Sequence, residues 1–225
     1  MPVISIVALK GGVGKTTIAL SLAAEYRVRG FSVLLADADP QGSSLAWGSA
    51  ASENPRAQAT VPTVVGVRDG FYRPDQLPKL AESYDWTIID TPPHAGPTLR
   101  AALAVADLAL LPCGPGALEA WALGDTVRII DEARIARPGL AAAIVLNRVQ
   151  KRTAIGAGAR EALADAGIPV AKSWLGFRVT FTEAVAAGLA PTTYQPKSPA
   201  ADEVRALCDE TTALCGMKRT KRRGK

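Results

Sequence analysis

The stretch "VISIVALKGGVGKTTIAL", residues 3–20, joins a strand signal to a helix signal through a loop of glycines. Residues 3–9 form an apolar, β-branched run, and residues 16–30 have apolar residues at helical spacing and end at a glycine. The order Gly-Lys-Thr between a strand and a helix is typical of the GxxxxGK[ST] loop. That loop surrounds phosphate oxygens with backbone amides and a helix N-terminus. The chain therefore begins with a predicted phosphate-binding loop.

This loop contains two lysines and departs from the general pattern at one position. Lys15 directly precedes Thr16, as the pattern requires, whereas Lys10 stands at the other end of the glycines and Leu9 replaces the first glycine. We expect Lys15 to bridge the β and γ phosphates and the Thr16 hydroxyl to ligate Mg²⁺. The glycines expected to let the backbone wrap around the phosphates are Gly11, Gly12 and Gly14.

Length and composition favour one α/β domain. The chain has 225 residues and is 48% hydrophobic, which suffices for one substantial core and is too little for two. We expect a single domain over residues 1–216 and a basic, disordered tail over residues 217–225. No basic leader precedes the first apolar run, and no stretch approaches the roughly 20 apolar residues that span a bilayer. A cytoplasmic protein is therefore expected.

The positive charge of the chain is concentrated in the tail. The net charge is +5, and the last eight residues, "KRTKRRGK", carry six positive charges and no negative ones. The remainder of the chain is close to neutral. Such a tail attracts polyanions without reading their sequence, although a solubilising end with no partner has the same composition.

Strand and helix signals alternate along the rest of the chain. Apolar, β-branched runs are separated by helical segments, one of them near residues 75–83, and this alternation is typical of a mostly parallel sheet. We predict a doubly wound α/β fold, with a mostly parallel sheet and helices on both faces. The predicted strands after the first cover residues 31–39, 63–67, 86–90, 106–113, 140–149 and 168–175.

Polar side chains stand at the carboxyl ends of several predicted strands, where doubly wound folds bind their ligands. Asp37 and Asp39 are two residues apart on a predicted strand and are expected to face the same way. Asp90 ends the apolar run "WTIID", as a Walker B carboxylate does, and is predicted to bind Mg²⁺ directly or through water. Asn147 follows another buried run, where a turn role is equally open.

Three ordered motifs resemble those of one known family. They are "KGGVGKTT" at 10–17, "DADPQG" at 37–42 and "IIDTPP" at 88–93, and "RVTFTEAVAAG" at 178–188 is similar to the segment before the family's last helix. Together they resemble the deviant Walker A ATPases of the ParA/MinD superfamily, and most of all the ParA partition ATPases. The resemblance implies that Lys10 is the signature lysine, which reaches across a dimer interface to the nucleotide of the partner subunit. ATP with Mg²⁺ would then hold a homodimer together.

The resemblance also implies roles for the carboxylates. Asp37 would lie near the Mg²⁺ ion, Asp39 would position the attacking water in a slow, partner-stimulated hydrolysis, and Asn147 would contact the adenine edge. The predicted catalytic residues are Lys10, Lys15 and Asp39, and the predicted metal ligands are Thr16, Asp37 and Asp90. The predicted ATP-binding residues are Lys10, Gly11, Gly12, Val13, Gly14, Lys15, Thr16, Thr17 and Asn147.

The implied function is a nucleoid-associated ATPase that binds DNA without sequence preference as an ATP dimer. It would position a plasmid, a chromosome region or another cargo through a ParB-like or cargo adaptor protein that stimulates hydrolysis. Arg178 is a candidate DNA contact, although an arginine between two apolar residues is equally suited to a structural ion pair. The other predicted DNA contacts are Lys218, Arg219, Lys221, Arg222, Arg223 and Lys225.

Other classes of protein fit the sequence less well. A MinD-like membrane regulator would end in an amphipathic helix, but residues 200–216 carry four acidic residues and lead into a tail without an apolar face. No membrane partner is therefore expected. A metabolic P-loop enzyme would need a lid, and a metal-cluster reductase would need paired cysteines near the nucleotide, where Cys113 stands alone. The single histidine, His94, supports no histidine-based catalysis.

Overall fold

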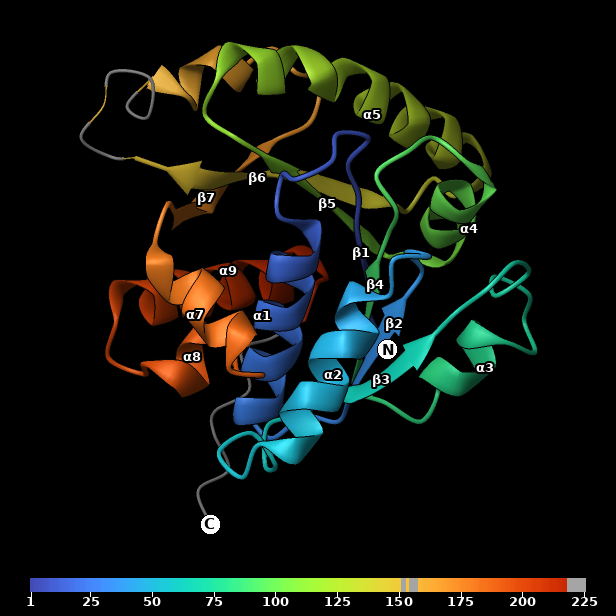
Figure 1. Cartoon of the computed structure of the whole chain (residues 1–225). Coiled ribbons are helices and arrows are strands. Elements are labelled where there is room, and N and C mark those ends of the chain that lie inside the picture. The colour runs from blue at the N-terminus through green and yellow to red at the C-terminus, as the bar shows by residue number, and fades with distance from the viewer. Residues whose placement is uncertain (151–152, 154–157, 218–225) are drawn as a thin grey trace.

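The computed structural model describes residues 1–150, 153 and 158–217 (Figure 1). In this part of the chain seven strands form one sheet, and every neighbouring pair of strands is parallel. The predicted doubly wound α/β fold is confirmed. In spatial order the strands are β3 (Thr63–Gly66), β2 (Val33–Asp37), β4 (Trp86–Asp90), β1 (Val3–Ile6), β5 (Leu108–Cys113), β6 (Ala141–Val149) and β7 (Val170–Gly176).

Helices cover both faces of the sheet (Figure 1). One apolar cluster joins the strands to α1, α2, α7 and α9, and a second joins them to α4 and α5. The helix bounds are α1 (Lys15–Val28), α2 (Ser43–Glu53), α3 (Leu77–Ala81), α4 (Pro97–Val105), α5 (Ala117–Ala136), α7 (Val179–Ala186), α8 (Pro191–Tyr194) and α9 (Pro199–Leu214), with a short 3₁₀ helix at Glu161–Leu163.

The order of the strands reverses direction at β1. The chain runs from β1 outward to β2 and β3, returns to β4, and then crosses to β5 on the other side of β1. In doubly wound sheets the crevice at such a reversal is the usual ligand site. The loop that follows β1 lies at this crevice, and Asp37 and Asp90 are direct register partners beside it.

Helix α1 is held against the sheet and against α9 by an aromatic contact and a hydroxyl network. The Tyr26 ring stacks on the Trp86 ring of β4, with centroids 4.1 Å apart and planes 17° apart. The Tyr26 hydroxyl hydrogen-bonds with Thr211 Oγ1 of α9 at 2.8 Å. Because α1 begins at the glycine loop, these contacts fix the position of the loop relative to the sheet.

Helix α2 was not predicted from the sequence. Its residues are mostly serine, alanine and glycine, so its amphipathic pattern is weak, but Trp47 and Ala51 are buried against the core. Gly48 lets the helix approach β3, because a Cβ at this position would stand 2.7 Å from Val64 Cγ2. Tertiary packing, and not local periodicity, therefore determines this helix.

Two glycine-to-alanine substitutions test the packing of α7 against α2. Gly188 follows α7 with φ +66°, and a Cβ there would lie 2.8 Å from the backbone carbon of Ala50. Gly124 lies on α5 with nothing within 4 Å of the added Cβ. Gly188→Ala should lower the free energy of unfolding by about 1–3 kcal/mol, because strain and overlap combine. The matched control Gly124→Ala should raise it by about 0.5–1 kcal/mol. Urea denaturation measures both values, and equal midpoints for the two variants would contradict this account of the packing.

Candidate functional site

The glycine loop between β1 and α1 has the shape of an anion cradle. Gly12 and Gly14 have φ +75° and +96°, a region that favours glycine. A Cβ on Gly14 would also stand 2.2 Å from Asn147 Nδ2, so the loop packs directly against the end of β6. Gly14 caps α1 without a side-chain hydrogen bond, which leaves the first amides of a 14-residue helix directed at the loop.

Lys15 is buried at the first position of α1, with 7% of its surface exposed. Burial lowers the pKa of its ammonium group, and the carboxylates of Asp90 and Asp39 oppose that shift. A buried cation at the end of a cradle of backbone amides is the arrangement that binds a phosphate group. The predicted contact of Lys15 with the phosphates stays a prediction.

Asp90 is fully buried at the end of β4. Its Oδ2 accepts a hydrogen bond from Ser44 Oγ at 2.9 Å, whereas its Oδ1 has no hydrogen-bond partner among the described residues. Burial raises the pKa of the Asp90 carboxyl to about 6, and the nearby hydroxyl groups of Thr16 and Ser44 oppose this rise. An unpartnered buried carboxylate oxygen next to a hydroxyl is a donor set for a hard divalent cation, so these residues fit Mg²⁺.

Ser44 was not identified from the sequence. It lies in the first turn of α2, which the sequence analysis did not predict, and it is buried. The run "DADPQGSS" contained a signal for the start of α2. A glycine followed by two serines, directly after a predicted strand, is typical of a helix N-terminus.

Strand β2 ends at Asp37, and Asp39 lies two residues beyond it in a bend, so the predicted strand at residues 31–39 is two residues too long at this end. That the two carboxylates face the same way stays a prediction. Asp37 is buried, and its two oxygens accept the amides of Asp39 at 3.1 Å and Leu45 at 2.9 Å. Burial raises the pKa of the Asp37 carboxyl, and these amide hydrogen bonds oppose the rise. Asp37 therefore organises the loop before α2, and its role near Mg²⁺ stays a prediction.

Asp39 is only partly buried, and its Oδ1 accepts the amide of Gln41 at 3.0 Å. This hydrogen bond within the turn directs the carboxylate of Asp39. Asp39 also influences the pKa of Lys15, which places the two charges in one electrostatic environment. A partly exposed carboxylate near a phosphate-binding lysine is compatible with the predicted water-positioning role.

The Lys10 side chain forms an ion pair with Glu119 of α5. Lys10 Nζ lies 3.0 Å from Glu119 Oε1, and the two side chains are 40% and 32% exposed. The hydrogen bond from Lys10 lowers the pKa of Glu119. Sequence reasoning did not identify Glu119, because the two residues are 109 positions apart and no local pattern connects them.

Asn147 is buried against the glycine loop. Its Nδ2 donates to the carbonyl oxygen of Val13 at 2.7 Å, and its Oδ1 accepts the amide of Arg148 at 2.9 Å. The side chain therefore stabilises the loop, and one N–H and one lone pair of its amide group are left over. The predicted contact with the adenine edge stays a prediction.

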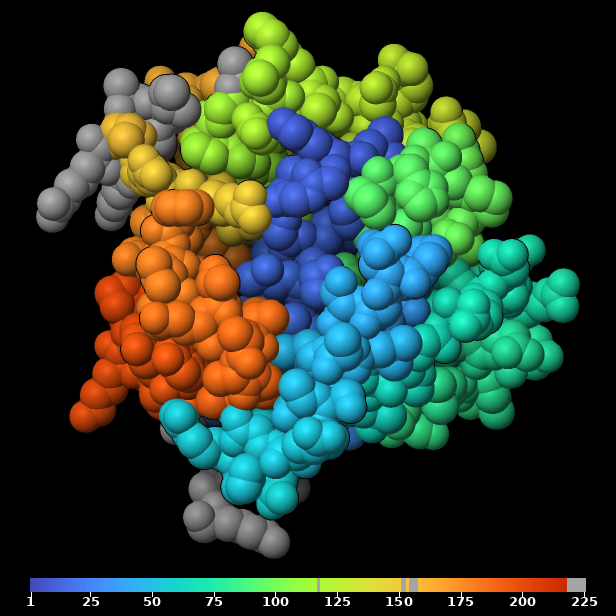
Figure 2. Space-filling model, viewed as in Figure 1, coloured from blue at the N-terminus to red at the C-terminus, as the bar shows by residue number. Residues whose placement is uncertain are grey.

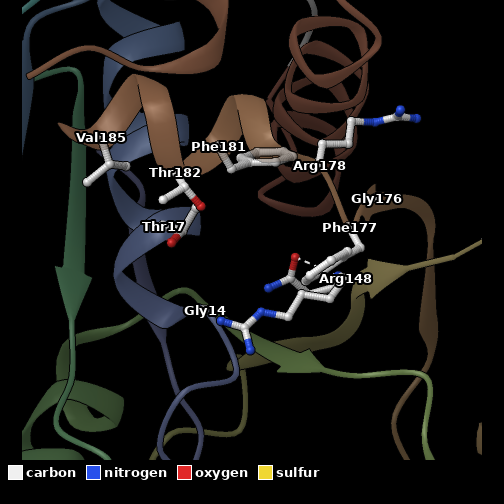
Figure 3. A pocket seen from close by; sticks show the side chains of 10 residues that line it. Gly14, Thr17, Arg148, Gly176, Phe177, Arg178, Phe181, Thr182 and Val185 are labelled. Atoms are coloured by element: carbon white, nitrogen blue, oxygen red, sulfur yellow. Dashed lines mark hydrogen bonds between the residues drawn. The ribbon is translucent and has the colours of Figure 1, made fainter. Parts of the chain in front are cut away.

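A pocket of about 240 Å³ opens beside the loop, between α1, α7 and the ends of β6 and β7 (Figure 3). In the space-filling view the N-terminal segment reaches the surface where α2, α7 and the start of α5 meet (Figure 2). The pocket is lined by Gly14, Thr17, Asn147, Arg148, Gly176, Phe177, Arg178, Phe181, Thr182 and Val185.

Arg178 forms an ion pair with Glu203 of α9, with Nη2 2.6 Å from Oε1. This is the structural alternative left open by the sequence, and the DNA contact of Arg178 stays a prediction. The six basic tail residues that were predicted to contact DNA lie outside the described residues.

His94 is exposed in the loop between β4 and α4. No helix in the described part of the chain is long and apolar enough to cross a membrane.

Comparison with known proteins assigns the family. Residues 4–192 match the model of the CobQ/CobB/MinD/ParA nucleotide binding domain. The chain is 33% identical over 205 residues to the maintenance of carboxysome distribution protein A of Halothiobacillus neapolitanus, covering 90% of this chain and 92% of that protein. It is 28% identical to the chromosome-partitioning ATPase Soj of Thermus thermophilus, covering 91% and 92% of the two chains.

The solved structures agree with the fold. The ATP complex of Cyanothece McdA aligns with a TM-score of 0.76 at 19% identity and covers 98% of each chain. MinD of Pyrococcus horikoshii with Mg-ADP aligns with a TM-score of 0.73 at 22% identity and covers 98% of this chain and 99% of that one. The prediction of ATP and Mg²⁺ is confirmed by these relatives, since one is an ATP complex and the other holds Mg-ADP. The fold and the site define a P-loop nucleotide-binding protein, and the chain belongs to the CobQ/CobB/MinD/ParA family.

The raised pKa of Asp90 predicts a specific pH dependence of the nucleotide-free protein. Its folded-state pKa of about 6 exceeds the ordinary 3.8, so the folded protein binds this proton more tightly than the unfolded chain. Proton binding to Asp90 therefore stabilises the folded state to its full extent below about pH 4, and this contribution to the free energy of unfolding is lost as the pH rises through about 6. Asp90→Asn should stabilise the protein at pH 7.5 by up to about 3 kcal/mol and have little effect at pH 4.

Urea denaturation without nucleotide or Mg²⁺ checks this prediction at both pH values. Asp37, whose pKa is also raised, interacts electrostatically with Asp90, so the comparison of the variant with the wild type reports the loss of the Asp90 carboxyl together with its effect on Asp37. Asp165→Asn, at an exposed position, is the matched control and should leave stability unchanged at both pH values. An Asp90→Asn variant that is less stable than wild type at pH 7.5 would contradict the assignment.

Proposed function

We propose that this protein is an ATP-dependent dimerising switch that binds DNA without sequence preference and positions a cargo. The observation that carries the proposal is the placement of Lys10, which belongs to the glycine loop and yet lies partly exposed in an ion pair with Glu119 of α5. A lysine so placed is available to a nucleotide on a second subunit. Catalysis and association then become one event, because the cation completes the site of the partner subunit.

The described residues divide the work of nucleotide binding and hydrolysis. The loop amides and Lys15 hold the phosphates, Thr16 and Asp90 provide the oxygens for Mg²⁺, and Asp37 keeps the start of α2 in place. When bound, Mg²⁺ would neutralise charge on the transferred phosphoryl group. Asp39 orients the attacking water as a weak base, so turnover is slow and depends on a stimulating partner.

The ion pair between Lys10 and Glu119 gives the switch a resting position. In the free subunit Glu119 attracts Lys10, and nucleotide phosphates with a higher charge compete for the same cation. Because the pair is partly exposed, it contributes little to stability, and its loss on dimerisation costs little. Association therefore requires the phosphates and not a large rearrangement of the loop.

The relatives suggest the kind of cargo. One relative that is similar over 90% of this chain is named for carboxysome distribution, and another over 91% is named for chromosome partitioning. We propose that this chain likewise positions a large assembly, either a protein-bound organelle or a chromosome region, over DNA. A separate adaptor protein would connect the dimer to the cargo and stimulate hydrolysis, after which the dimer opens.

The dimer switch is tested by light scattering with ATP and Mg²⁺. The wild type should double its mass, and Lys10→Ala should bind ATP and stay monomeric, with hydrolysis reduced by about 100-fold or more. Asp39→Ala should dimerise and hydrolyse poorly, which traps the closed state. Glu119→Gln should dimerise at lower ATP concentration, because Lys10 loses its resting partner. An unchanged mass of the wild type with a non-hydrolysable ATP analogue would refute the switch.

The tail is tested by DNA binding of the ATP-bound dimer. Truncation after Gly216 should weaken binding to duplex DNA of any sequence and reduce the dependence of affinity on salt, because up to six basic residues per subunit are removed. A tail with the same residues in scrambled order is the control and should bind as the wild type does. Sedimentation with anionic liposomes, without binding to DNA at low salt, would replace this proposal with the MinD-like membrane alternative.

A further inference from the structure

Phe177 is a large apolar side chain with 65% of its surface exposed at the turn between β7 and α7. Single exposed apolar residues are common, so exposure alone has no significance. Phe177 differs from the other exposed apolar residues because it lines the pocket that begins at Gly14 of the phosphate loop. Figure 3 shows its ring at the pocket, on the opposite side from Thr17 and Thr182 in this view.

One carboxylate of α9 binds the residues on both sides of Phe177. Glu203 Oε2 accepts the amide of Gly176 at 3.0 Å, and Glu203 Oε1 accepts Arg178 Nη2 at 2.6 Å. The Glu203 side chain is only 12% exposed, so this charged pair is shielded from water. The amide of Phe177 itself donates to the carbonyl oxygen of Val149 at 3.1 Å. Three consecutive residues are thus held in place.

The neighbouring part of the pocket rim is also fixed. Arg148 has φ +57°, an uncommon conformation for a residue other than glycine, and its amide is held by Asn147 Oδ1 at 2.9 Å. Its guanidinium group extends along the pocket toward Gly14 (Figure 3). Phe181 of α7 completes the apolar wall. The pocket thus presents an aromatic ring and a guanidinium plane next to the phosphate cradle.

This combination fits one kind of occupant. Aromatic rings and guanidinium planes bind flat π systems by stacking, and they do so for nucleobases. A group held here would be attached to phosphates in the adjacent loop, which makes it the base of a bound nucleotide. The Phe177 backbone is held in advance and its side chain has only two rotatable bonds, so the side chain loses little conformational entropy on binding, and the contact contributes to affinity efficiently.

We propose that Phe177 stacks on the nucleotide base and that Glu203 is the positioning residue that presents it, through Gly176 and Arg178. This inference rests on the proposed nucleotide-binding function and adds the residues that recognise the base. It also gives Arg178 a structural role, because the ion pair of Arg178 with Glu203 holds the turn between β7 and α7. The phosphates and the base are then held by separate parts of the fold, the first by α1 and the second by the β7–α7 turn and α9.

The test compares equilibrium binding of ATP with that of inorganic tripolyphosphate, which lacks the base, to the full chain in the presence of Mg²⁺. Phe177→Ala should weaken ATP binding about tenfold and leave tripolyphosphate binding unchanged. Phe177→Tyr keeps the ring and should bind ATP as the wild type does. Val179→Ala is the matched control, because Val179 is 69% exposed two residues away and does not line the pocket.

Glu203→Gln tests the positioning role. It should weaken ATP binding by a smaller factor than Phe177→Ala, because the amide keeps an acceptor for Gly176 and loses the ion pair with Arg178. In the Phe177→Ala background the same substitution should have no further effect on ATP binding, because its only contribution to the base is through the ring. If Glu203 were merely structural, Glu203→Gln would lower tripolyphosphate binding, and it would weaken ATP binding further in the Phe177→Ala background.

The outcomes separate this inference from the proposed function. ATP binding unchanged by Phe177→Ala, or ATP and tripolyphosphate binding weakened equally, would overturn the stacking role while nucleotide binding stands. A wild-type protein that binds neither compound would overturn both. An additional loss caused by Glu203→Gln in the Phe177→Ala background would overturn the positioning role alone.

Discussion

The contact between Gly14 and Asn147 connects the two halves of the site. Gly14 follows the central strand β1, and Asn147 lies near the end of β6, two strands away in the sheet. The absence of a Cβ on Gly14 allows the Asn147 amide group to reach the carbonyl oxygen of Val13. This approach determines where the glycine loop lies, and the loop in turn places Lys15 and the N-terminus of α1.

The charges of the site are buried in a way that favours a ligand. Lys15 and Asp90 are both nearly inaccessible to water. Burial lowers the pKa of Lys15 and raises the pKa of Asp90, and both shifts favour the neutral form of the group. The carboxylates of Asp90 and Asp39 attract Lys15 and offset part of this cost. In the proposed nucleotide complex, a phosphate beside Lys15 and Mg²⁺ beside Asp90 would give both buried groups a further partner of opposite charge.

The fold and the phosphate part of the site could be predicted from the sequence because their signals are local. The predicted strands match the described ones to within a few residues, and the glycine loop carries its own pattern. Helix α2 was missed, because its buried residues follow from packing against β3. The strand before Asp39 was predicted two residues too long, because the Asp37 carboxylate accepts the Asp39 amide and the strand ends at Asp37. The partner of Lys10 was missed for a related reason, since Glu119 comes close only after β5 and α5 have packed.

Arg178 illustrates how a surface charge acquires its role from the fold. Sequence alone left a DNA contact and an ion pair equally open, and the decisive residue is Glu203, 25 positions away on α9. A guanidinium group that binds a shielded carboxylate through both Nε and Nη2 has fewer free donors for a phosphate backbone. Its position at the pocket beside the glycine loop connects α9 to the candidate site, although α9 contributes no residue to the loop. Helix α9 also carries Thr211, which hydrogen-bonds with Tyr26 of α1, so the same helix supports both the helix that follows the loop and the turn that holds Phe177. In the proposed nucleotide complex, a change at α9 would therefore reach both the phosphate end and the base end of the nucleotide.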